Sequence, residues 1–239
     1  MKRWLVLISL VISTLSFAQN VKTYIPPQAF AHKETIRNEL TEYFPSIYDF
    51  NYVPALIEHE SCISLKHSKC WNSQSKLSTK RELGIGLGQV TKAYNPDGSV
   101  RFDSLSNMKA VYKEELKEAS WSNIQYNPNI QIRIIVLMLR DDYKKLYSVK
   151  DEKVRLQMTD SSYNGGIRDV HRARRACGLA KGCDPQLWFD HTEKHSVKST
   201  RILYGNRSAK DINNYHVRDV FFTRLPKYQQ QYFTHKDNL

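Results

Sequence analysis

Apolar residues recur every three or four positions through much of the chain, which is the period of an amphipathic helix. The predicted helices cover residues 33–43, a segment from near Pro54 to Glu60, and the ranges 104–116, 130–146 and 217–225. The segment 130–146 is apolar on most sides, which predicts a central buried helix. Since no internal repeat or linker interrupts the pattern, we expect one mostly α-helical domain.

Two of these helices have a predicted inner face. The inner face of the helix at 104–116, which Asp103 or Ser104 would cap, consists of Met108, Val111, Tyr112 and Leu116. The inner face of the last helix consists of Val217, Val220, Phe221 and Leu225.

Polar and glycine-rich segments separate the helices. Residues 64–80 and 177–213 lack apolar periodicity, which predicts loops, and 95–98 ("NPDG") predicts a turn. Residues 82–90 ("ELGIGLGQV") have three glycines at alternate positions, a poor pattern for a helix. We expect a small β or irregular element there, with tight backbone near a cleft.

Glu60 occupies an unusual position in the second predicted helix. Val53, Leu56 and Ile57 form an apolar stripe whose next member is Glu60, whereas Glu58 and His59 fall on other faces. Burial at the edge of such a stripe raises the pKa of a carboxyl group, which then can act as a general acid. The alternative is a core glutamate paired with a lysine or arginine.

The four cysteines form two close pairs, Cys62 with Cys70 and Cys177 with Cys183. An even number in an oxidising compartment predicts disulfides, and local pairing, in which each pair brackets a short polar loop, is the favoured one of three connectivities. The alternative is a structural zinc site, because His59, Cys62, His67 and Cys70 are of the right ligand types.

The first residues have the pattern of an export signal. A basic start, Lys2 and Arg3, precedes an apolar run and a small-x-small site at Ser16 and Ala18, so we expect residues 1–18 to be removed and Gln19 to become the first residue. The apolar run is shorter than the roughly 20 residues that cross a bilayer, which predicts no stable membrane insertion after cleavage. An uncleaved anchor is the alternative.

The mature chain is strongly basic. Removal of 18 of the 239 residues leaves 221, and the loss of Lys2 and Arg3 lowers the net charge from +12 by 2 to +10. A basic exported protein is attracted to polyanions. Because the chain lacks the basic and aromatic array of a nucleic-acid-binding module, we expect the anionic cell envelope, and not nucleic acid, as its partner. Charge that serves solubility alone is the alternative.

Three separated segments carry residues that a plain helical core does not require. They are Glu60-Ser61, Gly86-Leu87-Gly88-Gln89 and Tyr163-Asn164-Gly165-Gly166. In this order they resemble the soluble lytic transglycosylases, lysozyme-like enzymes with Glu-Ser, Gly-Leu-x-Gln and Ala-Tyr-Asn segments. Residues 129–143 and 212–220 also resemble the family's central and closing helices. The insert at 101–123 and the segment "GCDPQLWF" resemble the phage-encoded branch.

The resemblance implies a domain organisation. The lysozyme-like, goose-type catalytic domain would cover residues 48–228, with the Gly-Leu-Gly-Gln segment in the small β or irregular element. A lead-in and first helix (19–47) would precede it, and a C-terminal tail (229–239) would follow. We expect a monomer.

The resemblance also implies site residues. Glu60 matches the catalytic acid, Gln89 matches a glutamine beside the cleft, and Tyr163 and Asn164 match the cleft-lining pair. Ser61 and Tyr215 are the further predicted substrate-binding residues, the latter as the late tyrosine that approaches the catalytic glutamate. Gly88 and Ser162 replace the usual Met and Ala, and neither change removes chemistry. An aromatic core residue followed by a turn asparagine is the alternative reading of Tyr163-Asn164.

Glycosidic cleavage usually requires two carboxylates, but a second one is not evident. Goose-type lysozymes carry an Asp two residues after the glutamine, where this chain has Thr91, and Glu82, Asp97 and Asp103 are other candidates. Without a second carboxylate, the substrate's own N-acetyl group would stabilise the cation. Glu60 would then act first as acid and afterwards as base on the C6 hydroxyl of muramic acid, with no metal or cofactor.

The expected function is therefore that of a periplasmic or cell-envelope lytic transglycosylase acting on peptidoglycan glycan strands. It would cleave the β-1,4 bond between MurNAc and GlcNAc and leave 1,6-anhydro-MurNAc ends. One alternative is a muramidase that cleaves the same bond with water. Another is a non-catalytic module that binds the wall. The sequence leaves open a phage or bacterial origin and a role in lysis, remodelling or envelope assembly.

Overall fold

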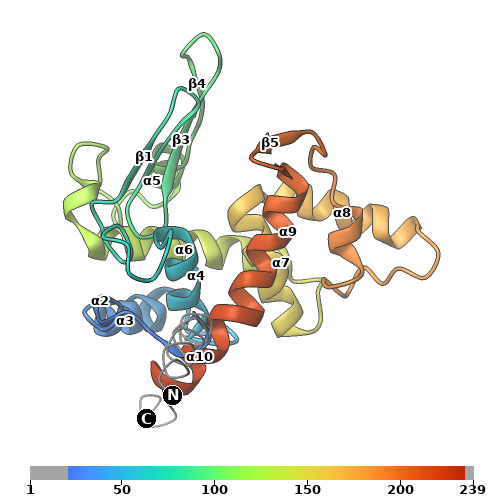
Figure 1. The fold of residues 1–239 in the computed structure, drawn as a ribbon, viewed down its shortest axis with the longest axis horizontal. Helices are drawn as coiled ribbons and strands as arrows, with labels where there is room; N and C mark the ends of the chain where they lie inside the picture. The colour runs from blue at the N-terminus through green and yellow to red at the C-terminus, as the bar shows by residue number, and fades with distance from the viewer. Residues whose placement is uncertain (1–20, 235–239) are drawn as a thin grey trace, which may run out of the picture.

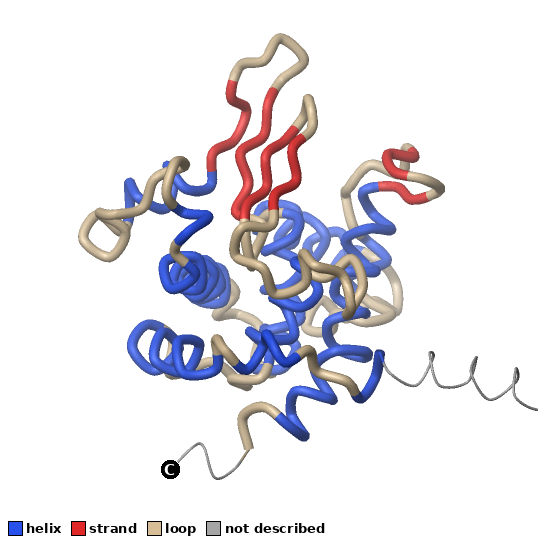
Figure 2. Tube along the Cα trace, turned by 60° about the vertical axis from the view of Figure 1, so that its left-hand side comes forward, coloured by secondary structure: helices blue, strands red, loops and turns tan. Residues whose placement is uncertain are grey.

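The computed structural model describes residues 21–234, and its mostly α-helical architecture with a small antiparallel sheet confirms the predicted class (Figures 1 and 2). In Figure 1 the four-stranded sheet projects upward from the helical body as a narrow ribbon, and α9 and the β5 region lie to the right of it. The predicted export signal at 1–18 lies outside the described residues. Among the helices of residues 21–234, none has the length and apolar composition needed to cross a bilayer.

The N-terminal helices form part of the core. α2 (Pro27–Phe30) is followed by α3 (Lys33–Tyr43), which has the predicted bounds, and by α4 (Tyr52–Ser61), which begins two residues before Pro54. Buried side chains from 25–47 belong to the same apolar cluster as α4, so this lead-in is packed against the helices that follow.

α6 (Pro128–Lys145) is the central helix that the apolar segment predicts. Asn127 caps its N-terminus by accepting a hydrogen bond from the backbone of Ile130 at 3.1 Å. α6 packs against α3 on one side and α7 on another. Its side chains contribute to both apolar clusters, the large helical core and a smaller one beneath the sheet.

The sheet is an antiparallel meander in the order β1-β2-β3-β4. Its strands are β1 (Lys76–Ser78), β2 (Glu82–Ile85), β3 (Val90–Tyr94) and β4 (Val100–Asp103). Ile85 pairs with Val90, so the Gly-Leu-Gly-Gln segment is the β2–β3 hairpin loop, and the predicted turn at 95–98 joins β3 to β4.

α5 (Ser104–Val111) is shorter than predicted. Asp103 caps it, as expected, by accepting a hydrogen bond from the backbone of Ser106 at 2.8 Å. The prediction that Val111 lies on the inner face is wrong: the helix ends there, and Val111 is 66% exposed. Leu116 is buried, but it reaches the core from the turns after the helix.

The C-terminal half adds a second group of helices. Gly166 separates α7 (Glu152–Gly165) from α8 (Ile167–Leu179). The 3-10 helix η2 (Thr192–His195) and the small sheet of β5 (Ile202–Tyr204) and β6 (Arg207–Ser208) lie between α8 and α9 (Ala209–Asp219). The π-helical turn η3 (Val220–Arg224) and α10 (Leu225–Gln231) continue α9. All four residues of the predicted inner face, Val217, Val220, Phe221 and Leu225, are buried.

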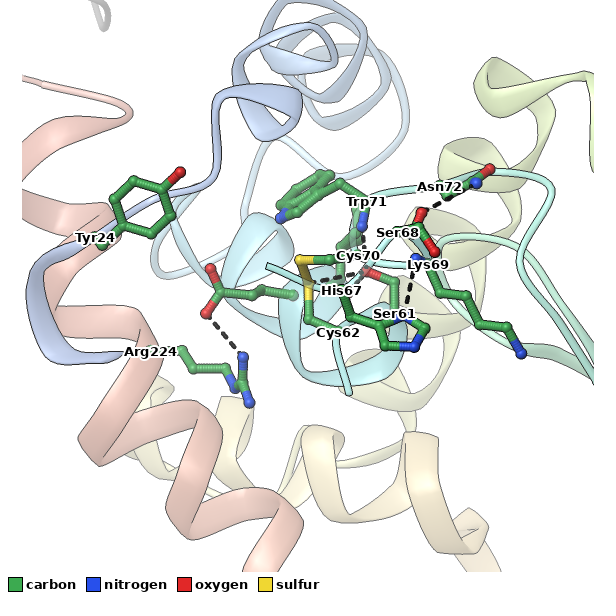
Figure 3. The surroundings of a disulfide bond; sticks show 12 residues. Tyr24, Ser61, Cys62, His67, Ser68, Lys69, Cys70, Trp71, Asn72 and Arg224 are labelled. Carbon is green, nitrogen blue, oxygen red and sulfur yellow. Dashed lines mark hydrogen bonds and ion pairs between the residues drawn. A yellow bond between two sulfur atoms is a disulfide. The ribbon is translucent and has the colours of Figure 1, made fainter. Parts of the chain in front are cut away.

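Both disulfides have the predicted local pairing, Cys62–Cys70 and Cys177–Cys183. The first closes the loop that leaves α4, and Figure 3 shows it beside Ser61 and Trp71. Because Cys62 and Cys70 are bonded to each other, their sulfur atoms are not the thiolate ligands that the zinc alternative requires. Within residues 21–234 the one metal-like cluster contains Cys177, Cys183 and His195, and its cysteines are likewise disulfide-bonded.

The exported protein is expected to begin at Gln19 and to contain no free thiol. The first expectation follows from the export signal, and the second from the two disulfides. Intact-mass measurement of alkylated protein should show no adduct before reduction and one on each of the four cysteines afterwards. Alkylation without reduction, or stoichiometric zinc, would contradict the disulfide assignment.

The prediction that Glu58 lies outside the buried face of its helix needs correction. Glu58 is completely buried and is surrounded by partners from the C-terminal helices. Its carboxylate contacts Nη1 of Arg224 at 2.8 Å, Nζ of Lys227 at 2.7 Å and the hydroxyl of Tyr228 at 2.8 Å. The core glutamate paired with cations, which the sequence offered as an alternative for Glu60, is therefore Glu58.

Candidate active site

Glu60 lies in the last turn of α4, where the helix reaches the surface. Its side chain is 15% exposed, in contrast to the fully buried Glu58. Oε1 of Glu60 accepts a hydrogen bond of 2.7 Å from Nε2 of His216 on α9. No described residue donates a hydrogen bond to Oε2. Among the described residues, the carboxyl group is thus held through Oε1.

His216 is held between two carboxylates. Its Nδ1 donates to Oδ2 of Asp160 on α7 at 2.9 Å, while Oδ1 of Asp160 accepts a hydrogen bond of 2.6 Å from Tyr52. Burial opposes a charge on His216, but Asp160 and Glu60 outweigh it and raise its pKa to about 10. The group is therefore an imidazolium at neutral pH, and both ring nitrogens are donors.

A second histidine lies against this chain of contacts. The rings of His59 and His216 meet edge to face with centroids 4.2 Å apart. Burial lowers the pKa of His59, and the positive charge of His216 lowers it further, although the hydrogen bond to Asp219 opposes the shift. Nδ1 of His59 lies 2.7 Å from Asp219, which also accepts from Arg224 at 2.5 Å. His59 thereby joins the Glu60 group to the cations around Glu58.

The β2–β3 loop is fixed against the central helix. The buried Gln131 of α6 accepts a hydrogen bond of 2.8 Å from the backbone of Leu87 and donates to two backbone carbonyls. Gly86 has a φ of +79°, and a Cβ there would lie 2.0 Å from Oε1 of Gln131. The predicted tight backbone is confirmed, since only glycine allows this approach.

Tyr163 joins the loop to the helix that carries Asp160. Its hydroxyl donates to the carbonyl of Gly88 at 2.7 Å, and a Cβ on Gly88 would lie 2.6 Å from that hydroxyl. Burial raises the pKa of Tyr163 well above its usual value, and the charges of Glu60 and Asp160 add to the shift. The Gly-Leu-Gly-Gln and Tyr-Asn segments therefore meet at this hydrogen bond, with Tyr163 as a neutral donor.

The other predicted residues have these positions. Asn164 is exposed and accepts a hydrogen bond of 3.0 Å from Asn213 on α9. Gln89 folds back and donates to the carbonyl of Gly86 at 2.9 Å. Ser61 is buried; its hydroxyl donates to Ile57 and accepts from the backbone of Trp71, which ties the disulfide loop to α4. A role of these three residues in substrate binding stays a prediction.

Tyr215 is 46% exposed and lies one residue before His216. Its ring centroid is 6.2 Å from that of His59, and the guanidinium of Arg207 lies 4.2 Å from its centre. His216 makes the contact with Glu60 that the resemblance implied for Tyr215. Tyr215 is thus placed on the surface beside the site, where a role in binding sugar stays a prediction.

Two of the candidate second carboxylates have local partners. Asp97 accepts hydrogen bonds from Ser99, which lower its pKa, in the exposed β3–β4 turn. Asp103 caps α5 and pairs with Lys92 at 3.0 Å. The hydroxyl of Thr91 donates to the carbonyl of Gln89 at 2.6 Å. The carboxylate nearest to Glu60 in this network is instead Asp160, on the far side of the imidazole ring.

Sequence reasoning missed His216 and Asp160, although both carry the signal that identified Glu60. His216 lies four residues before the buried Val220, and Asp160 lies four residues after the buried Leu156, so each is a polar residue within an apolar stripe. Applying the stripe criterion to every helix would have found them.

A surface hollow on α8 lies away from these residues. It is lined by His171, Arg174, Arg175, Gly178 and Pro185. Arg174 is already bonded to the carbonyl of Pro185 and to Ser148. We place the candidate site at Glu60, where the chemistry is, and not at this hollow.

The sequence matches no model of a known protein family and no curated protein.

Proposed function

We propose that this protein is an exported peptidoglycan lytic transglycosylase with a lysozyme-like fold, and that Glu60 is its general acid and base. The observation that carries the proposal is the Glu60 carboxyl group, partly exposed at the end of a buried helix and held by the described residues through Oε1. The order of the Glu-Ser, Gly-Leu-x-Gln and Tyr-Asn segments supports it, as does the hydrogen bond between Tyr163 and Gly88 that joins the second segment to the third.

The proposed reaction needs one carboxyl group. Glu60 donates its proton to the glycosidic oxygen between MurNAc and GlcNAc, and the bond from that oxygen to C1 of MurNAc breaks. The N-acetyl oxygen of the substrate stabilises the positive charge at C1. The Glu60 carboxylate then takes the proton of the C6 hydroxyl while the oxygen of that hydroxyl bonds to C1. This gives 1,6-anhydro-MurNAc and restores the acid form of Glu60.

The surroundings of Glu60 favour this route over hydrolysis. A hydrolase of the inverting type needs a second carboxylate across the sugar ring to activate water. Asp160 is completely buried and lies behind His216. Asp97 and Asp103 are bonded within the sheet and its connections. An internal C6 hydroxyl, in contrast, is already positioned and costs little entropy to recruit.

The basic charge is consistent with a substrate in the cell envelope. The net charge of +10 after signal removal attracts the protein to anionic wall polymers, whose stem peptides carry carboxylates. We therefore propose glycan strands of peptidoglycan as the substrate and the periplasm or envelope as the site of action.

Products released from purified peptidoglycan are expected to end in 1,6-anhydro-MurNAc. Mass spectrometry distinguishes this product from a reducing MurNAc end, because it is one water lighter and resists borohydride reduction. Predominantly reducible ends would reject the transglycosylase proposal in favour of a muramidase, and would direct attention to Glu82, Asp97 and Asp103. Binding to walls without any loss of turbidity would instead indicate a non-catalytic module.

A further inference from the structure

We infer that His216, held by Asp160, is a positioning residue for the proposed reaction: it fixes Oε1 of Glu60 and directs proton transfer through Oε2. This inference rests on the proposed function. His216 is 2% exposed, so it does not reach a substrate, and any effect on the reaction passes through Glu60.

The geometry assigns a separate role to each carboxyl oxygen. Oε1 lies 2.7 Å from Nε2 of His216 and accepts its hydrogen bond. None of the described residues donates to Oε2, which leaves that oxygen to carry the transferable proton. A proton on Oε1 would face an N–H donor, which is an unfavourable arrangement. The carboxyl group is therefore oriented before the substrate binds.

The orientation of the ring is itself fixed from behind. Asp160 accepts from Nδ1 at 2.9 Å, and Tyr52 of α4 donates to the other oxygen of Asp160. Asp160 thus keeps a hydrogen on Nδ1 and opposes rotation of the ring. A carboxylate that accepts a hydrogen bond from one nitrogen of a functional imidazole generally fixes the orientation of the ring. Here the ring that Asp160 orients is hydrogen-bonded to Glu60.

The charges that face His216 decide its state. From α4 they are Glu60 and His59, and from α7 it is Asp160; Tyr215 precedes His216 on its own helix. His59 adds no positive charge at neutral pH, because burial lowers its pKa. Two carboxylates therefore act on one imidazolium, which retains its proton through the pH range of a wall-cleavage assay.

A positive charge at this distance acts on the reaction at Glu60. It stabilises the carboxylate that remains after the proton has passed to the leaving oxygen, so proton donation becomes easier. Because His216 does not reach the substrate, removing the charge should lower kcat and leave KM unchanged. A purely structural buried histidine would not give this split.

The test is the kcat and KM of His216→Gln, which removes the charge but leaves an amide donor in the side chain. We expect kcat to fall by about 10- to 100-fold, with KM unchanged. Asp160→Asn, which weakens the hold on the imidazolium, should lower kcat in the same way. His171→Gln, a histidine of α8 outside the network, is the matched control and should leave both quantities unchanged.

The possible results separate the inference from the proposed function. A normal kcat in folded His216→Gln, or a rise of KM with kcat unchanged, would overturn the inference even if the products carry anhydro ends. If His216→Gln does not fold, Asp160→Asn decides by the same two readouts. Reducible product ends from the wild type would reject the transglycosylase proposal, while the fall of kcat, followed by loss of turbidity, would still test His216.

Discussion

Glu60→Gln is expected to lower the rate of wall cleavage by about 10²- to 10⁴-fold, the range that a general acid or base contributes. The amide keeps the shape of the side chain but has no proton to give to the glycosidic oxygen. Its carbonyl oxygen can still accept the hydrogen bond from Nε2 of His216, which now spans 2.7 Å to Oε1. The fold and the binding of purified walls should therefore persist. Loss of turbidity measures the rate, and circular dichroism during heating measures the fold.

Glu114→Gln is the matched control, because it makes the same chemical change at a side chain that is 87% exposed and far from the network. It should retain wild-type turnover. A folded Glu60→Gln variant with near wild-type turnover would show that Glu60 is not the acid, and the proposed mechanism would be rejected. Wall binding without cleavage by the variant, in contrast, would agree with a role in chemistry and not in recognition.

Glu58→Gln, in contrast, is expected to change stability. It should lower the free energy of unfolding by about 3–5 kcal/mol, because it breaks a buried ion pair. The Glu58 carboxylate is completely buried and contacts both Arg224 and Lys227, and Lys227 is itself fully buried. An amide cannot balance these two cations: Arg224 keeps Asp219, but Lys227 retains only backbone carbonyls, so buried positive charge is left uncompensated. Denaturation with urea gives the free energy, and any activity should be compared at a temperature where the variant is folded.

Glu114→Gln again serves as the control for stability, since an exposed ion pair contributes little. Combining Glu58→Gln with Lys227→Met should recover part of the loss, because one of the unbalanced cations is removed with its partner. A urea midpoint for Glu58→Gln equal to that of the wild type would contradict the buried network. Glu58 would then not have the stabilising role that distinguishes it from Glu60.

The fold was predictable where local signals decide it. The bounds of α3, the Asp103 cap of α5 and the turn at 95–98 follow from periodicity and from residues with known cap and turn preferences. Val111 was misplaced because α5 stops after eight residues, and a helical stripe extended past its end no longer describes the chain.

The candidate site was predictable only in part. Glu60 follows from its own helix, but the partners that decide the fate of each glutamate lie far along the sequence. His216 is 156 residues from Glu60, and Arg224 is 166 residues from Glu58. One helix's pattern does not say which later helix will cover each of its faces. Glu58 therefore read as outward-facing, although η3 and α10 enclose it.

The contacts of Lys227 and its neighbours on α10 bear on the order in which the chain acquires its structure. Lys227 donates to the carbonyls of Val21 and Tyr24, Gln231 donates to that of Thr23, and Tyr232 donates to that of Ala29, across separations of 203 to 208 residues. Closing loops of this length is slow compared with forming local helices. During synthesis, α4 is complete long before α10 exists, so Glu58 has neither of its cations until the last helix has emerged. The proposed export of the chain would benefit from this delay, because the final core stays open until nearly the whole polypeptide has been delivered.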